Sequence, residues 1–144
     1  MNRIDRMDGE EAYDLCGQII GLAMKVHSTL GSGFLESVYQ NALALELRKA
    51  GFKVELEKPI SVHYEGELVG AFTADLLVNE TFILELKAIQ ILAKIHEVQL
   101  VNYLTATQLS EGLLLNFGAS CLEFKKKFRL QRTEPFSLRV PAIL

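Results

Sequence analysis

The chain has 144 residues, 15 lysines and arginines against 18 aspartates and glutamates, and a formal net charge of −3. This size, with 49% hydrophobic residues, predicts one domain with a substantial core. The net acidic charge lacks the overall basic character typical of a DNA-binding domain. No apolar run is long enough to span a bilayer, and the charged segment 1–11 has no signal-peptide core, so a cytoplasmic location without membrane association is expected.

In chain order, the pattern predicts a helix, a second helix, a β-rich centre, a third helix and a final pair of strands. Apolar residues three and four apart predict a first helix over 15–30, preceded by a loosely ordered segment 1–11 and ended by Gly31. A second helix over 35–47 is stopped by Gly51. Strands are expected over 53–57, 60–64, 71–78, 82–88, 113–117 and 122–130, and a helix over 95–107. This order predicts a single α/β domain with a mixed sheet flanked by helices.

Asp75, Glu85 and Lys87 are unusual because they lie on apolar segments that read as strands. The segments 71–78 and 82–88 form a hairpin in the simplest interpretation. A three-residue loop over 79–81 places Asp75 opposite Glu85 with Lys87 on the same face, whereas a two-residue loop sends Glu85 and Lys87 to the other face. The longer loop is favoured because the Asn-Gly and Asp-Gly signals of tight turns are missing.

Two facing carboxylates repel each other unless a proton or a cation lies between them. Mg²⁺ prefers oxygen ligands and is typically held by one or two carboxylates together with substrate phosphate. A lysine beside such a pair could orient a water molecule and offset charge that develops on a phosphate. Asp75, Glu85 and Lys87 therefore indicate phosphodiester hydrolysis; a purely structural ion-pair cluster is the alternative.

The same residues, followed by Gln99 and Tyr103 on the third helix, resemble the PD-(D/E)xK nuclease superfamily, in particular its RecB-like and lambda-exonuclease-like branches. Upstream, Gly33-Phe34-Leu35-Glu36-Ser37-Val38-Tyr39 resembles the signature of the GxxExxY protein family, a small-domain branch of that superfamily. The segments 26–31 and 112–118, the latter reading Gly-Leu-Leu-Leu-Asn-Phe-Gly, also fit this family. The resemblance runs from about residue 14 to residue 132. An alanine, Ala74, stands where the superfamily motif has its proline.

The resemblance implies one restriction-endonuclease-like domain over residues 1–144 that cleaves DNA or, less favoured, RNA with Mg²⁺ or Mn²⁺. It implies Asp75, Glu85 and the Leu86 carbonyl as metal ligands, with Glu36 as an additional acid. Lys87 would orient the attacking water, and Gln99 and Tyr103 would line the cleft. From spacing alone, Glu36 could simply complement the helix dipole, and Gln99 could face solvent while Tyr103 belongs to the core.

Basic residues gather near the C-terminus: residues 121–144 carry six basic and two acidic groups. They could contact phosphates, or they could protect an edge strand from aggregation. Five of the six form one basic segment: Lys125, Lys126, Lys127, Arg129 and Arg132. Three interpretations remain open: a nuclease, an inactive nuclease-fold module that binds nucleic acid or a protein, and a part of a larger assembly whose apolar helix faces form a homodimer.

Overall fold

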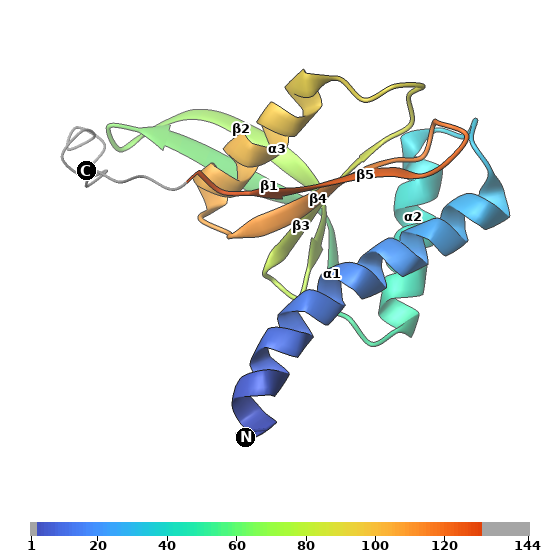
Figure 1. The fold of residues 1–144 in the computed structure, drawn as a ribbon. Helices are drawn as coiled ribbons and strands as arrows, with labels where there is room; N and C mark the ends of the chain where they lie inside the picture. Colours follow the sequence, from blue (N-terminus) through green and yellow to red (C-terminus); the bar gives the residue numbers. More distant parts are fainter. Residues whose placement is uncertain (1–2, 131–144) are drawn as a thin grey trace.

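A computed structural model describes the backbone of residues 3–130 and the side chains of residues 15–130. Over this range the chain forms a five-stranded mixed sheet with helices on both faces (Figure 1). The strands lie side by side in sequence order, β1 to β5, and only β3 and β4 run parallel. The elements are α1 (Arg3–Leu30), α2 (Glu36–Lys49), β1 (Val54–Tyr64), β2 (Glu67–Val78), β3 (Phe82–Lys87), α3 (Lys94–Thr107), β4 (Glu111–Asn116) and β5 (Glu123–Phe128). The predicted α/β class and mixed sheet are confirmed.

Glycines end the first two helices where the sequence predicts. After α2, the Gly51 N–H donates to the Arg48 carbonyl and the Phe52 N–H donates to the Leu47 carbonyl. These two bonds form the Schellman motif, and Gly51 adopts the positive φ of 95° that this motif requires. Helix α1 begins at Arg3 instead of near Leu15, so helical backbone extends into the segment that was expected to be loosely ordered.

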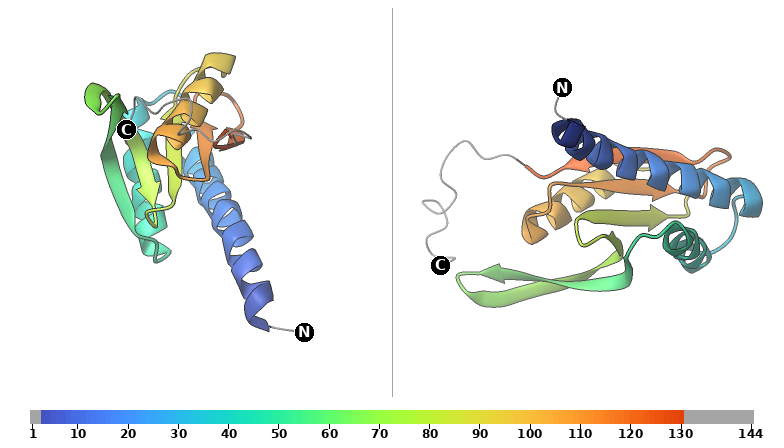
Figure 2. Two further views of the ribbon diagram at one scale, coloured as in Figure 1. Left: turned by 90° about the vertical axis from the view of Figure 1, so that its left-hand side faces the viewer. Right: turned by 90° about the horizontal axis from the view of Figure 1, so that it is seen from below.

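Two strand predictions differ from the structure. Strand β1 is continuous through Pro59, where the sequence predicted two separate strands, and β2 begins at Glu67 instead of Ala71. Proline has no backbone N–H to donate to a neighbouring strand, and Pro59 is tolerated because β1 lies at the edge of the sheet. The resulting β1–β2 hairpin extends past the other strands (Figure 2). Strand β3 pairs with β2 only through Leu76, Leu77 and Val78.

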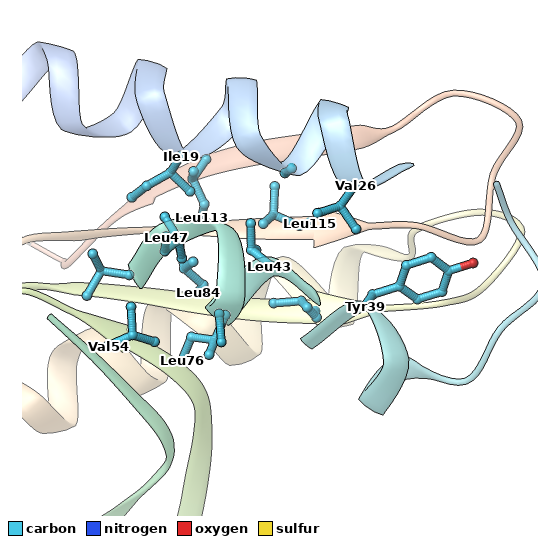
Figure 3. Close-up of a cluster of buried hydrophobic side chains, with 14 of the residues drawn as sticks. Ile19, Val26, Tyr39, Leu43, Leu47, Val54, Leu76, Leu84, Leu113 and Leu115 are labelled. Carbon is cyan, nitrogen blue, oxygen red and sulfur yellow. The ribbon is translucent and has the colours of Figure 1, made fainter. Parts of the chain in front are cut away.

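Apolar side chains form one core on each face of the sheet. The larger core packs α1 and α2 against the sheet and includes Ile19, Leu43, Leu76, Leu84 and Leu115 (Figure 3). The smaller core packs α3 against the opposite face. Its buried members are Ile60, Ala74, Leu77, Ile83, Leu100, Leu104 and Leu114. Strands β3 and β4 are covered on both sides, which explains their nearly continuous apolar sequences.

Candidate active site

The hairpin between β2 and β3 has the three-residue loop that brings the two acids together. Val78 pairs with Phe82 and Leu76 with Leu84, and the same register places Asp75 opposite Glu85. The backbone pairing of β2 with β3 ends at Leu76, and beyond this point the two carboxylates accept hydrogen bonds from the backbone N–H groups. The Asp75 N–H donates to Glu85 Oε1 at 3.2 Å, and the Leu86 N–H donates to Asp75 Oδ2 at 2.7 Å. Each acid therefore binds the backbone of the strand that carries the other.

Burial raises the pKa of both acids in the absence of a cation. Burial and the Asp75 charge raise the pKa of Glu85 from its ordinary 4.5 to about 8. Burial also raises the pKa of Asp75, although the hydrogen bond from Leu86 opposes that change. Two carboxyl groups that are costly to ionise together are typical of a place where a positive charge is expected to bind.

Helix α2 brings a third acid and a backbone anchor to this pair. Glu36, the first residue of α2, adds to the rise in the pKa of both Asp75 and Glu85 through its charge. Gln40, one helical turn further, donates from Nε2 to the Asp75 carbonyl at 3.2 Å. Gln40 thus holds the N-terminal part of α2 next to Asp75, one of the two acids on which the charge of Glu36 acts. On β1, Glu57 also raises the pKa of Asp75 and has a positive φ of 50°.

Lys87 is the last residue of β3 and lies two positions beyond Glu85 on the same face. Its charge lowers the pKa of both Asp75 and Glu85, which places it within electrostatic reach of the pair. It forms neither an ion pair nor a hydrogen bond with any side chain between residues 15 and 130. The ammonium group is therefore free to contact a water molecule or a phosphate.

Tyr103 reaches the same region from α3, whereas the exposed Gln99 side chain forms no hydrogen bond with either acid in the described range. Burial raises the pKa of Tyr103, and the charges of Glu85 and Asp75 add to the rise. The Tyr103 ring stacks on Phe72 of β2, with ring centroids 3.7 Å apart. Gln99, one helical turn earlier, is exposed and has no hydrogen-bond partner within the described residues.

The basic segment lies on β5, at the edge of the sheet opposite β1. Lys125 and Lys127 pair with Leu114 and Gly112, and Lys126 pairs with Leu113, so the lysines alternate between the two faces of the sheet. Intramolecular partners occupy three of the basic groups: Lys126 pairs with Glu111 at 3.5 Å, Lys127 with Glu97 at 3.1 Å, and Arg129 donates to the Gln108 carbonyl at 2.8 Å. Arg132 lies outside the described residues.

Tyr39 and His27 support the site from a distance. The Tyr39 hydroxyl donates to the Gly31 carbonyl at 2.5 Å and accepts the Phe34 N–H at 3.1 Å, so it fixes the turn before Glu36 and does not contact Glu36 itself. The Tyr39 ring stacks on Phe117 with centroids 4.7 Å apart. His27 Nε2 donates to the Ala119 carbonyl at 2.9 Å. The Gly-x-x-Glu-x-x-Tyr segment and the Asn-Phe-Gly segment therefore contact each other.

The donor set fits a hard divalent cation. Both acids offer carboxylate oxygens, and Mg²⁺ commonly binds one or two carboxylates while water fills its remaining positions. The N–H and C=O of a strand residue point to the same edge, so the Leu86 carbonyl faces Asp75, as its N–H does. Within the described part of the chain, no three His, Cys, Asp or Glu residues lie close enough to enclose a metal, so Glu36 does not complete a side-chain cage.

Comparison with known proteins agrees with this architecture. A family model described as the PD-(D/E)XK nuclease superfamily matches residues 13–129, and the chain belongs to that superfamily. A search of curated proteins finds no match. The solved structure titled "Crystal structure of SSO0001" has a similar fold, with a TM-score of 0.52 and 17% sequence identity. The match covers 67% of this chain and 52% of that one, so this chain spans about half the length of that protein. No helix in the described range is long and apolar enough to cross a membrane.

Four residues at or near the site were not singled out by the sequence: Gln40, Glu57, Phe72 and Asn116. Only Asn116 had a signal, because it lies in the Gly-Leu-Leu-Leu-Asn-Phe-Gly segment that supported the family resemblance. The other three depend on contacts between elements whose mutual placement the sequence does not reveal. Gln40, for example, reads as an ordinary polar residue of an amphipathic helix.

Proposed function

We propose that this chain is a metal-dependent nuclease in which Asp75, Glu85 and the Leu86 carbonyl hold Mg²⁺ or Mn²⁺. The observation that carries the proposal is the buried pair of acids at the end of the β2–β3 ladder. A structural ion pair would join opposite charges, whereas this pair joins two acids, and burial together with the Asp75 charge raises the pKa of Glu85. A bound divalent cation would offset that repulsion and polarise a water molecule for attack on phosphorus.

The other residues have roles that follow from their positions. Lys87 would hold the attacking water or the scissile phosphate, because its ammonium group has no competing partner in the described range. Glu36 would set the charge of the site from α2, while Tyr103 and Gln99 would line the substrate side. Lys125 is the lysine of β5 without an intramolecular partner in that range, so it would contribute most of that strand's phosphate contacts, with Lys126, Lys127 and Arg129 contributing less.

Within the superfamily, the GxxExxY protein family is the proposed branch, because Tyr39 and Phe117 join its two sequence segments in one stack. The substrate is nucleic acid, with DNA favoured over RNA. A cytoplasmic location and a homodimer formed through apolar helix faces remain proposals that rest on the sequence.

A cleavage assay on single- and double-stranded DNA and RNA, with Mg²⁺, Mn²⁺ or a chelator, tests the proposed function. Asp75→Ala and Lys87→Ala should each abolish metal-dependent cleavage. Lys49→Ala removes an exposed lysine of α2 and should cleave like the wild type. Equal cleavage by wild type, Asp75→Ala and Lys87→Ala would point to a contaminating nuclease and refute the assignment.

Calorimetric titration with Mn²⁺ separates the nuclease from the inactive module. The wild type should bind Mn²⁺, and Glu85→Ala should weaken binding strongly because it removes one of two carboxylate ligands. Mn²⁺ binding that is absent, or that Glu85→Ala leaves unchanged, favours the module that binds nucleic acid or a protein without cutting.

A further inference from the structure

The Asn116–Gly118 segment begins at the last residue of β4 and forms hydrogen bonds with the chain that leaves the candidate active site after β3. We propose that Asn116 is a positioning residue that fixes the end of β3, so that Lys87 and the Leu86 carbonyl stay directed at Asp75 and Glu85. This inference rests on the proposed nuclease function.

The Asn116 side chain is fully buried, and both polar atoms of its amide have hydrogen-bond partners. Its Oδ1 accepts the N–H groups of Ile89 and Gly118, each at 3.0 Å, and its Nδ2 donates to Glu123 Oε1 at 2.7 Å. Two partners are N–H donors and the third is a carboxylate, so the orientation of the amide follows from its environment. A buried amide is costly unless it is satisfied in this way, so the network has one stable geometry.

These bonds hold the backbone immediately after Lys87. In the parallel ladder Asn116 pairs with Lys87, and the Phe117 N–H donates to the Lys87 carbonyl at 2.8 Å. The Asn116 side chain holds the Ile89 N–H, and only Ala88 lies between these two fixed points. On the opposite edge of β3, Asp75 Oδ2 holds the Leu86 N–H. The strand end is therefore fixed from both sides.

Close packing around Gly118 leaves little room for this segment to move. A Cβ atom at Gly118 would lie 2.3 Å from the backbone N and O of Ile89, a distance that real atoms do not adopt. The chain on either side of Gly118 is also anchored. Phe117 stacks on Tyr39, and the Ala119 carbonyl accepts a hydrogen bond from His27. The backbone that carries the Asn116 side chain is therefore held in place.

The position of the strand end matters because Lys87 has a long, flexible side chain and no partner that holds its ammonium group within the described range. Its backbone is then the main constraint on where the charge lies. Misplacing a reacting group by about 1 Å can cost on the order of 100-fold in rate. Loss of the Asn116 amide would free the Ile89 N–H and allow such a displacement, while Asp75 and Glu85 keep their own hydrogen bonds.

The test compares three variants of the whole chain with the wild type: Asn116→Ala, Asn116→Asp and the double variant N116D/E123Q. Asn116→Ala removes the amide. Asn116→Asp keeps the acceptor for Ile89 but places two carboxylates together. The double variant restores a hydrogen bond across that pair with its polarity reversed. Glu123→Gln is the matched control, because the Asn116 amide can still donate to the glutamine oxygen.

Asn116→Ala and Asn116→Asp should lower kcat, while the concentration of folded protein, KM and the Kd for Mn²⁺ stay close to wild type. We expect a kcat loss on the order of 10- to 100-fold for Asn116→Ala, the size seen for residues that orient a catalytic group. The kcat of Asn116→Asp should lie between those of Asn116→Ala and the wild type. The double variant N116D/E123Q should recover most of the wild-type kcat, and the control Glu123→Gln should keep most of it. If the folded Asn116→Ala and Asn116→Asp proteins both keep the wild-type kcat, the proposal is wrong.

Amide hydrogen exchange gives a second readout that needs no activity. Exchange at Ile89 should be faster in Asn116→Ala, which removes the acceptor, than in wild type and in N116D/E123Q, while the β1–β2 ladder stays unchanged. Unchanged exchange at Ile89 would overturn the inference even if the enzyme is active. A wild type that binds no Mn²⁺ and cuts nothing would instead overturn the proposed function, and with it the catalytic part of this inference.

Discussion

Replacing Glu85 by glutamine should stabilise the metal-free protein, and the gain should grow with pH. Glutamine has nearly the same shape as protonated glutamic acid and can still accept the Asp75 N–H, so the substitution removes the charge and little else. The pKa of Glu85 is raised from its ordinary 4.5 to about 8 in the folded chain. The folded state therefore binds the proton more tightly than the unfolded state does.

The sign of the pH dependence follows from that difference. Below pH 4.5 the carboxyl group is protonated in both states and Glu85 costs no stability. As pH rises from 4.5 to about 8, the unfolded chain loses the proton first, and the wild type loses stability relative to Glu85→Gln. The difference should be about 2 kcal/mol at pH 6 and roughly 4 to 5 kcal/mol at pH 9.

Urea denaturation followed by circular dichroism, in chelator at pH 5, 7 and 9, measures this difference. Glu67→Gln, which changes an exposed acid at the start of β2, should follow the wild-type pH dependence. Mn²⁺ should narrow the gap at pH 9 by stabilising the wild type much more than Glu85→Gln. If Glu85→Gln has the same unfolding free energy as the wild type at pH 9 without metal, burial and repulsion do not act on Glu85 as argued here.

Five further substitutions test the site and its support. Asp75→Asn should abolish the rise in melting temperature that Mn²⁺ gives the wild type at pH 8, as measured by differential scanning fluorimetry with and without the metal. Gly118→Ala should unfold the chain or cost more than about 3 kcal/mol in urea denaturation, because its Cβ has no space, whereas Gly21→Ala lies in open space on α1 and should stabilise the helix by about 0.5 to 1 kcal/mol. Tyr39→Phe should cost about 1 to 3 kcal/mol in the same assay, because the Gly31 carbonyl and the Phe34 N–H, both in part-buried hydrogen bonds, lose their shared hydroxyl. Lys125→Ala should reduce the slope of log Kd against log salt by about one for a DNA oligonucleotide, and an unchanged slope would remove Lys125 from the DNA contact surface.

The sequence predicted those parts of the site that depend on local geometry. Side chains alternate along a strand, so the length of one loop decides whether Asp75 and Glu85 meet, and the three-residue loop over 79–81 was the better-supported choice. The ends of α1 and α2 were also predictable, because Gly31 and Gly51 adopt positive φ where each helix stops. In both cases a few neighbouring residues determine the outcome.

Contacts between distant elements could not be predicted from the sequence. Gln40 acquires its role only when α2 packs beside β2, and Asn116 only when β4 lies next to the end of β3. Pro59 was taken as a strand break because its edge position in the sheet was unknown. The basic segment was expected either to contact phosphates or to protect an edge strand, and the sequence did not reveal that alternation along β5 and the ion pairs of Lys126 and Lys127 give its members different surroundings.

The stack of Tyr39 on Phe117 bears on the order in which the domain can be assembled during synthesis. Tyr39 lies on the second helix and Phe117 directly after the fourth strand, so the ring contact joins segments from early and late in the chain. A contact between residues far apart in sequence carries the entropy cost of closing the loop between them, and it cannot form before both residues have been synthesised. A nascent chain that ends before Phe117 therefore cannot form the ring contact that fixes the helix of Glu36 relative to the end of β3, even though it already carries Asp75, Glu85 and Lys87. The candidate active site is completed only when Phe117, directly after β4, has left the ribosome.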